Sequence, residues 1–191
     1  MIELKKGRLP EAVEVDGEFY AVRTSFKFWL RFLELSADKG ARLTDFDFIY
    51  AGRIPQDRAK GLSALVRFCT PPEPLPRGAE GGGKVVDYRA DAGYIYAAFM
   101  EMYGIDLVES DMHWYKFQSL FRALHGTKLN EIIGYRLYES NGRRDGYARE
   151  MERLKRAWAL PDDDDGVDED LEEFQSRIGG GNRDGRDERG D

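Results

Sequence analysis

Residues 87–124, with the sequence DYRADAGYIYAAFMEMYGIDLVESDMHWYKFQSLFRAL, are the densest apolar and aromatic part of the chain. Their pattern predicts two helices joined by a Gly-Ile-Asp-Leu turn at 104–107. The apolar stripe of the first helix comprises Ala92, Ile95, Tyr96, Phe99, Met102 and Tyr103. Gly104 follows this stripe directly, where a left-handed C-cap favours a residue without a Cβ.

The second of these helices is expected to begin at a cap formed by Ser110 or Asp111. Its apolar stripe comprises Trp114, Phe117, Leu120, Phe121 and Leu124. Two amphipathic helices with a short connection pack as an antiparallel hairpin in most small helical proteins. We therefore expect a central helical hairpin to form the core of the fold.

The sequence before this hairpin predicts two short strands and three helical segments. Strand-like runs at 13–22 flank Asp16-Gly17, a dipeptide that favours a tight type I′ turn. Helices are expected at 26–35, capped by Thr24 or Ser25, and at 55–69. Residues 44–51 alternate in a way that also fits a strand, but the stop and start signals around them favour a helix.

The helix at 26–35 is apolar on most of its circumference, which is typical of a helix inside a core or against a partner. In a chain of this length the core is favoured. After the central hairpin, a helix is expected from the cap Thr127 through Leu137, and another at 145–160. The apolar positions of the helix at 145–160 are Tyr147, Met151, Leu154 and Trp158.

These patterns together predict a mainly α protein with one small helical domain at 1–160. The domain comprises the N-terminal β-hairpin and helices at 1–70, a Pro/Gly linker at 71–84, and the central helical hairpin and C-terminal helices at 85–160. Residues 161–191 carry 13 acidic and 4 basic residues, whereas the preceding residues carry 23 acidic and 25 basic ones. A segment so charged and so poor in apolar residues predicts a disordered acidic tail.

Charge and cysteine content limit the function classes. The first 160 residues have a net charge of +2, which gives little general attraction for nucleic acid. The single cysteine, Cys69, cannot form an internal disulfide, and its place in an apolar pattern favours a buried, inert thiol. No apolar run approaches the roughly 20 residues that cross a bilayer, and the first residues do not resemble a signal peptide. A soluble, cytoplasmic protein without membrane partners is expected.

Three near-matches to functional motifs fail on residue chemistry. Residues 78–84 resemble a phosphate-binding loop, but Val85 follows Lys84 where a serine or threonine must reach magnesium. An apparent calcium loop in the tail would place Pro161 at a ligand position. The two histidines, His113 and His125, lie apart from any cysteine, and His113 is expected to be a hydrogen-bonded residue at the core edge. We predict no catalytic, cofactor-binding or metal-binding residues, and therefore no enzyme.

A basic run extends from Arg143 to Arg156 and could contact phosphates. Glu150 and Glu152 are interleaved with it, so pairing of side chains three and four residues apart on a solvated helix explains it more simply. A small phage nucleic-acid-associated protein acting through this helix is the alternative function, and nucleic acid is not the expected partner.

Several segments resemble the bacteriophage "gene product fifteen" family of phages and prophages. They are LPEAVEVDGEFYAVRTSFKFWLRF, DYRADAGYIYAAFMEMYGIDL, MHWYKFQSLFRAL, TKLNEIIGYR and LKRAWALPD, which cover about residues 9–162 in order. The residues matching the central motif are Tyr94, Ile95, Tyr96, Phe99, Tyr103, Gly104, Ile105, Asp106, His113, Trp114 and Phe117. The match depends on aromatic and turn residues, and no catalytic signature is part of it.

The resemblance implies a non-enzymatic tail-assembly chaperone encoded next to the tape-measure protein of long-tailed phages. Such proteins coat the tape-measure helix, assist polymerisation of the major tail protein into the tail tube, act in the cytoplasm of the bacterial host and are absent from the mature virion. Self-association of this chain is also compatible with the resemblance. The expected partner-binding residues are Phe28, Trp29, Phe32, Tyr94, Tyr103, Trp114, Tyr147, Met151, Leu154 and Trp158. A chaperone for a long amphipathic helix needs apolar surfaces of this kind.

Overall fold

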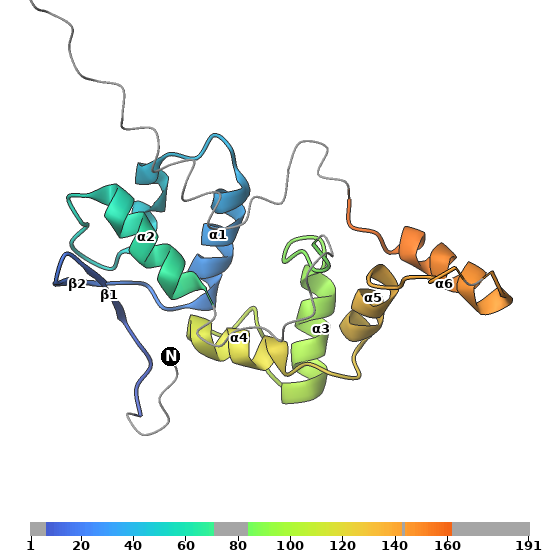
Figure 1. Ribbon diagram of the computed structural model, residues 1–191. Helices are drawn as coiled ribbons and strands as arrows, with labels where there is room; N and C mark the ends of the chain where they lie inside the picture. Colours follow the sequence, from blue (N-terminus) through green and yellow to red (C-terminus); the bar gives the residue numbers. More distant parts are fainter. Residues whose placement is uncertain (1–6, 71–83, 143, 162–191) are drawn as a thin grey trace, which may run out of the picture. The chain divides into compact units, whose positions relative to one another are not determined.

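A computed structural model describes residues 7–70, 84–142 and 144–161 and confirms a mainly helical fold with a short N-terminal β-hairpin (Figure 1). Its elements are β1 (Ala12–Val15), β2 (Glu18–Ala21), α1 (Phe26–Ala37), the 3₁₀ helix η1 (Leu43–Ile49), α2 (Arg58–Cys69), α3 (Ala92–Tyr103), α4 (Trp114–Arg122), α5 (Lys128–Arg136) and α6 (Gly146–Ala157). None of the described helices is both long enough and apolar enough to cross a bilayer. The predicted linker up to residue 83 and the predicted tail from residue 162 lie outside the described residues.

The described residues form two compact units where the sequence predicted one helical domain. Unit 1 comprises residues 7–70 and 112–115, and unit 2 comprises residues 84–111, 116–142 and 144–161. The boundary does not follow the predicted linker alone, because the short segment at 112–115 belongs to the N-terminal unit. Each unit has its own set of buried aromatic and aliphatic side chains.

The predicted hairpin is present in unit 1. β1 and β2 pair antiparallel, with Val15 opposite Glu18 across the two-residue turn. Both turn residues have positive φ, 52° at Asp16 and 81° at Gly17, as a type I′ turn requires. Val13 and Val15 are buried and lie on the face that α2 covers, and α2 packs mainly against β1.

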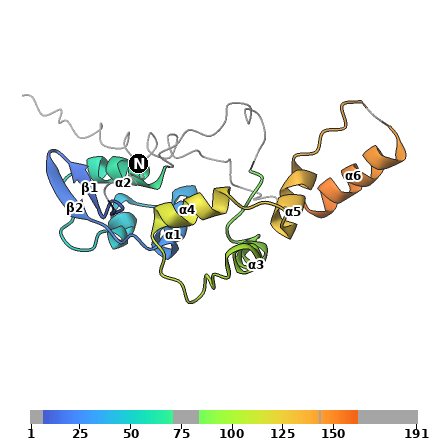
Figure 2. The same cartoon turned by 90° about the horizontal axis from the view of Figure 1, so that it is seen from below.

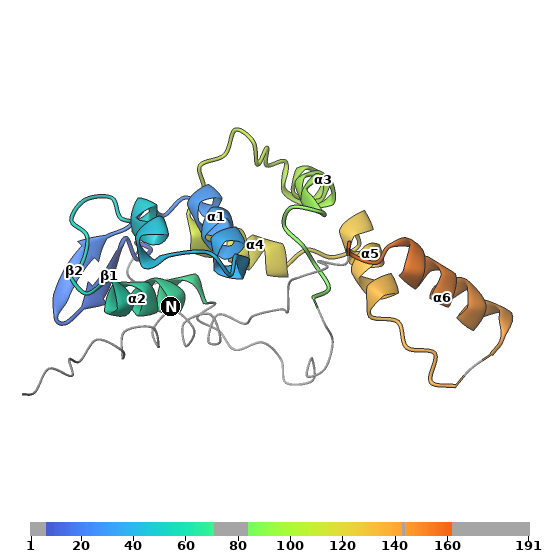
Figure 3. The same cartoon turned by 90° about the horizontal axis from the view of Figure 1, so that it is seen from above.

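The predicted antiparallel hairpin of the two central helices is wrong. α3 ends at Tyr103 with Gly104 in the left-handed conformation, as expected, but α4 begins only at Trp114. In Figures 2 and 3, α3 is seen end-on while α4 is seen along its length, so the two helices cross. Neither Ser110 nor Asp111 caps α4.

Backbone pairing explains why α4 starts late. The Phe26 N–H donates to the Met112 carbonyl at 2.9 Å, and the Trp114 N–H donates to the Thr24 carbonyl at 2.7 Å. This pairing holds 112–114 extended and satisfies the first donors of both α1 and α4. Ser25 lies at the N-cap position of α1, but its hydroxyl makes no capping hydrogen bond, so the expected side-chain cap is replaced by backbone contacts.

Between α1 and α2 the structure decides whether one segment is a strand or a helix, and it corrects the predicted start of α2. The segment predicted as a helix at 44–51 is the 3₁₀ helix η1, not a strand. α2 begins at Arg58 and not at Pro55, because the Asp57 carboxylate accepts the Lys60 backbone N–H at 3.0 Å and caps the helix there. The C-terminal helices agree with prediction: Thr127 and Asn130 form a capping box on α5, and Asp145 caps α6.

Gly61 in α2 allows a close approach that no other residue type permits. A Cβ at this position would lie 2.7 Å from the Tyr50 hydroxyl oxygen and 3.3 Å from Pro55 Cγ. We expect Gly61→Ala to lower the free energy of unfolding by about 1–3 kcal/mol, because both neighbours are buried and must shift. The measurement is urea denaturation followed by circular dichroism.

Gly134 in α5 provides the matched control, since a Cβ there meets no atom within 4 Å. Gly134→Ala is expected to stabilise the protein by about 0.5–1 kcal/mol through helix propensity. Equal effects of the two substitutions would show that the Tyr50 contact does not constrain Gly61.

Candidate protein-binding surfaces

Three of the expected partner-binding residues lie in the core of unit 1. Trp29, Phe32 and Trp114 have exposed fractions of 0%, 0% and 1%. The indole N–H of Trp29 donates to the Arg23 carbonyl at 2.9 Å, and that of Trp114 donates to the Cys69 carbonyl at 3.0 Å. Both indole rings therefore make their contacts inside unit 1, and no partner reaches them while unit 1 is folded.

Phe28 lies at the border of the buried face of α1, one turn before Phe32, and is half-buried. Its ring lies 6.4 Å from that of Phe48, and the two rings are flanked by guanidinium groups. Arg23 lies 5.1 Å from the Phe28 centroid and Arg31 lies 4.6 Å from the Phe48 centroid. The ring faces are covered by cation–π contacts, which leaves Phe28 as a partly available surface residue.

In unit 2, Tyr103 has a structural role and Tyr94 lies at the surface. The Tyr103 hydroxyl donates to the Leu120 carbonyl at 2.9 Å, which ties the end of α3 to α4. Tyr94 is 36% exposed and contacts the half-buried Trp158 edge to face at 5.7 Å. The Lys128 ammonium lies 5.5 Å from the Trp158 ring centroid, so these residues form a continuous aromatic ridge.

The predicted apolar stripe of α6 is only partly free. Met151 and Leu154 are half-buried, and α6 lies alongside α5 in all three views (Figures 1–3). Tyr147 is 63% exposed and meets Tyr138 edge to face at 6.2 Å. The stripe therefore packs within unit 2 and leaves Tyr147 as its exposed end.

A buried ion pair that the sequence analysis missed ties unit 2 together. The Arg136 guanidinium binds both carboxylate oxygens of Asp91, at 2.7 and 2.8 Å, and donates to the carbonyls of Val85 at 2.9 Å and Trp158 at 2.7 Å. The side chains of Arg136 and Asp91 are 9% and 2% exposed. Arg136 follows Leu129 and Ile132 at helical spacing, and a charge on this apolar face was the available signal that a buried acid faces it.

α3 has an exposed side that is mostly apolar. Ile95, Ala98 and Phe99 face inward, whereas the following residues are exposed along one side: Gly93, Tyr94, Ala97, Met100 and Gly104. We call this set the α3 face. Glu101 is the only charged residue of α3, and Met100 is 42% exposed. Small residues at Gly93, Ala97 and Gly104 allow a second helix to approach closely.

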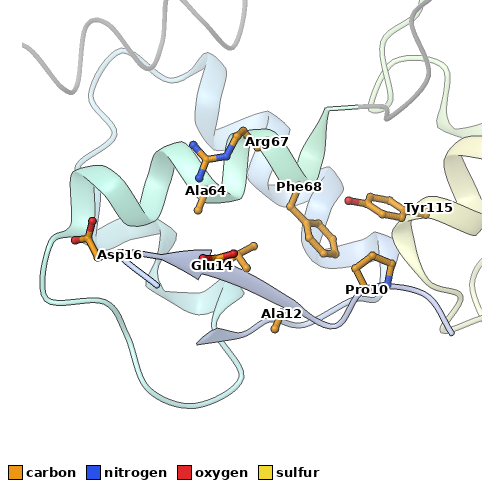
Figure 4. A pocket seen from close by; sticks show the side chains of 9 residues that line it. Pro10, Ala12, Glu14, Asp16, Ala64, Arg67, Phe68 and Tyr115 are labelled. Atoms are coloured by element: carbon orange, nitrogen blue, oxygen red, sulfur yellow. The ribbon is translucent and has the colours of Figure 1, made fainter. Parts of the chain in front are cut away.

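Unit 1 contains a groove between β1 and α2 with a volume of about 440 Å³ (Figure 4). Its lining residues are Pro10, Ala12, Val13, Glu14, Asp16, Ala64, Arg67, Phe68 and Tyr115. Figure 4 shows Phe68 and Tyr115 at one end of the groove and Arg67 and Glu14 further along it. Burial raises the pKa of Tyr115 to about 12, so its hydroxyl is neutral at physiological pH.

His113 holds the end of the groove where β1 begins. Its Nδ1 accepts the Tyr115 backbone N–H at 3.1 Å, which assigns the proton to Nε2, and Nε2 donates to the Pro10 carbonyl at 2.8 Å. Burial lowers the pKa of His113 below its ordinary value of 6.5, and the contacts to Pro10 and Glu11 oppose this effect in part. The expected role as a hydrogen-bonded residue at the core edge agrees with this geometry.

The lowered pKa of His113 predicts a loss of stability in mild acid. Below pH 6.5 the unfolded chain binds a proton at this histidine more readily than the folded chain, so the free energy of unfolding falls as the pH falls. Protonation also removes the acceptor of the Tyr115 N–H. We expect urea denaturation at pH 7.5 and 5.5 to show this fall in the natural chain and a smaller fall in His113→Gln.

The exposed His125 gives the control, because His125→Gln should follow the natural chain at both pH values. Parallel loss of stability in the natural chain and in His113→Gln would place the pH dependence elsewhere.

The structure also places the single cysteine and the basic run that the sequence analysis considered. Cys69 is buried, and burial raises the pKa of its thiol, in agreement with an inert cysteine. Within the basic run, Arg153 pairs with Glu150 at 2.6 Å and Lys155 donates to the Tyr138 carbonyl at 2.8 Å. Across residues 7–70, 84–142 and 144–161, no group of three or more His, Cys, Asp or Glu side chains is arranged to hold a metal ion.

The chain matches a model of a known protein family. A family model described as "Bacteriophage Gp15 protein" matches residues 58–160, which span α2 to α6 and contain nearly all of unit 2. No curated protein and no solved structure matches the chain.

Proposed function

Because the chain belongs to the bacteriophage Gp15 protein family, we propose that it is a tail-assembly chaperone that binds the tape-measure protein. In this proposal it holds amphipathic helical segments of the tape-measure protein and assists polymerisation of the major tail protein into the tail tube. It acts in the cytoplasm of the bacterial host and is not retained in the mature virion.

The α3 face carries this proposal. A long helical partner is recognised by laying its apolar stripe against an apolar helix face or groove. The α3 face is apolar, exposed and lined with small residues, and it lies inside the part of the chain that matches the family model. The adjacent ridge of Tyr94 and Trp158 extends the apolar surface, and Lys128 supplies a charge at its border.

The test is co-expression with the tape-measure protein of the same genome, followed by size-exclusion chromatography with light scattering. We expect the tape-measure protein to be soluble and to co-elute with several copies of this chain. Ala97→Lys and Met100→Lys place a charge on the α3 face and are expected to abolish co-elution without lowering thermal stability.

Ala37→Lys is the matched control, because Ala37 is an exposed alanine at the end of α1 in unit 1. This variant should bind as the natural chain does. A tape-measure protein that never associates with the natural chain would refute the proposed function, whereas binding that survives Ala97→Lys would refute the assignment to the α3 face.

A further inference from the structure

The outer edge of β1 carries backbone groups that no described residue pairs with. The Val22 N–H donates to the Glu11 carbonyl at 2.9 Å, and bonded residues alternate along an antiparallel ladder, so the odd-numbered residues of β1 bond to β2. The N–H and C=O groups of Ala12 and Glu14 therefore point to the outer edge. Within residues 7–70, 84–142 and 144–161, no backbone group bonds to them there. An open edge of this kind is a template for a further strand.

The groove between β1 and α2 lies beside this edge (Figure 4). Ala64, Phe68 and Tyr115 are buried residues that give it an apolar lining. A second hollow of about 360 Å³ shares lining residues with the groove and extends it toward Val15 and Ser63. A strand added to β1 would therefore lie over α2 and cover apolar surface.

Glu14 determines the charge that the outward side of such a strand must carry. Val13 is buried on the face that α2 covers, so Glu14 faces the other way, as does the exposed Phe19 opposite it. The Glu14 carboxylate forms no ion pair with a described residue, whereas Asp16 pairs with Lys60 at 2.8 Å. A basic side chain opposite Glu14 is favoured on an added strand, and an acidic one is disfavoured.

The α2 side of the groove determines the other face of the added strand. Ala64 and Phe68 lie on α2 and are buried, so side chains that point toward them must be apolar. Arg67 is exposed at the border of the groove and forms no ion pair with a described residue. It lies on α2, on the side of the hairpin that Glu14 faces away from, and so leaves the Glu14 charge without a counterion.

A second copy of β1 does not fit this edge. α2 packs mainly against β1, so each copy would bring its own α2 to the same side of the joined sheet. Neighbouring strands lie about 4.8 Å apart, whereas packed helices need axes about 8–10 Å apart. The two α2 helices would therefore clash. An extended segment without a helix of its own avoids this clash.

We propose that the outer edge of β1 binds an extended segment of another protein as an antiparallel third strand. The segment directs apolar side chains toward α2 at the positions opposite Val13 and Val15, and it places a basic side chain opposite Glu14. Its backbone exchanges hydrogen bonds with Ala12 and Glu14, as in other strand additions to an open edge. This site lies in unit 1 and is separate from the α3 face of unit 2, so it does not depend on binding of the tape-measure protein.

The probe is the peptide acetyl-TVKVTV-amide, added to the full-length ¹⁵N-labelled chain and followed by NMR. Its lysine is designed to lie opposite Glu14, with the flanking valines toward α2. At saturation, the Ala12 and Glu14 amides should exchange at least about tenfold more slowly, and the Val13 amide, which bonds to β2, should be unchanged. No slowing at Ala12 and Glu14 would overturn the proposal. Strong protection of both amides before peptide is added would also overturn it, because the edge would already be paired.

Two N-methylated peptides test whether the backbone carries the binding. N-methylation of the lysine and of the second threonine removes the donors to β1 and should weaken binding at least about tenfold. N-methylation of the two valines that flank the lysine blocks N–H groups that point away from β1, and this peptide should bind as the unmodified one does. Equal affinities of the two methylated peptides would overturn the proposal.

Charge reversal tests the position of the basic side chain. The natural chain should bind acetyl-TVKVTV-amide about three to ten times more tightly than acetyl-TVEVTV-amide, and Glu14→Lys should reverse this preference. Glu34→Lys is the matched control, because Glu34 is an exposed glutamate of α1, and it should keep the preference of the natural chain. An unchanged preference in Glu14→Lys would overturn the proposal.

Discussion

Arg136→Met is expected to lower the free energy of unfolding of unit 2 by about 3–5 kcal/mol, which is a large fraction of the stability of a small domain. The substitution leaves the Asp91 carboxylate buried without its partner and removes the donors to the Val85 and Trp158 carbonyls. An uncompensated buried charge costs more than the pair contributed. Urea-dependent hydrogen exchange of α3 and α5 measures the effect.

Two comparisons separate this effect from the loss of any arginine. Arg153 is paired with Glu150 on an exposed face, where both side chains are more than half exposed, so Arg153→Met should change stability by less than about 1 kcal/mol. The double variant Arg136→Met with Asp91→Leu should recover part of the loss, because no buried charge remains. A double variant as unstable as Arg136→Met alone would show that the lost carbonyl contacts dominate.

Trp114→Ala is expected to destabilise unit 1 by about 3–5 kcal/mol, since it empties a fully buried site. The ring stacks near Trp29 with a centroid distance of 6.4 Å, and its N–H satisfies the Cys69 carbonyl. Trp114→Phe should cost less, because it keeps most of the apolar volume and loses mainly the hydrogen bond. Thermal unfolding followed by circular dichroism gives both values.

Tyr147→Ala is the control for aromatic truncation, because Tyr147 is 63% exposed and should shift stability by no more than about 0.5 kcal/mol. In the co-elution experiment, Trp114→Ala should weaken tape-measure binding only under conditions in which unit 1 of the variant is unfolded. Loss of binding by folded Trp114→Phe would contradict the assignment of Trp114 to the core.

The candidate surface was only partly accessible to sequence reasoning. Trp158 was selected from its helical spacing and Tyr94 from the family resemblance, and the structure brings the two rings together at 5.7 Å. Trp29, Phe32 and Trp114 belong to apolar helical patterns but are buried, because an apolar stripe has the same spacing whether a core or a partner covers it. Ala97 and Met100 were missed, since small and flexible side chains have no distinctive pattern.

The sequence by itself determined the local structure of this protein. Helical spacing of apolar residues, the Asp16-Gly17 turn, the Gly104 C-cap and the Thr127 cap depend on neighbours within a few residues, and each was found where predicted. The family followed from the same aromatic and turn residues, and the match over residues 58–160 confirms it.

The tertiary structure alone decided how these elements combine. The crossing of α3 and α4 depends on backbone pairing of 112–114 with 24–26, and the stability of unit 2 depends on a contact between Asp91 and Arg136, which are 45 residues apart. Such contacts join residues distant in the chain, and no local pattern specifies which distant partner a backbone group or a buried charge will find.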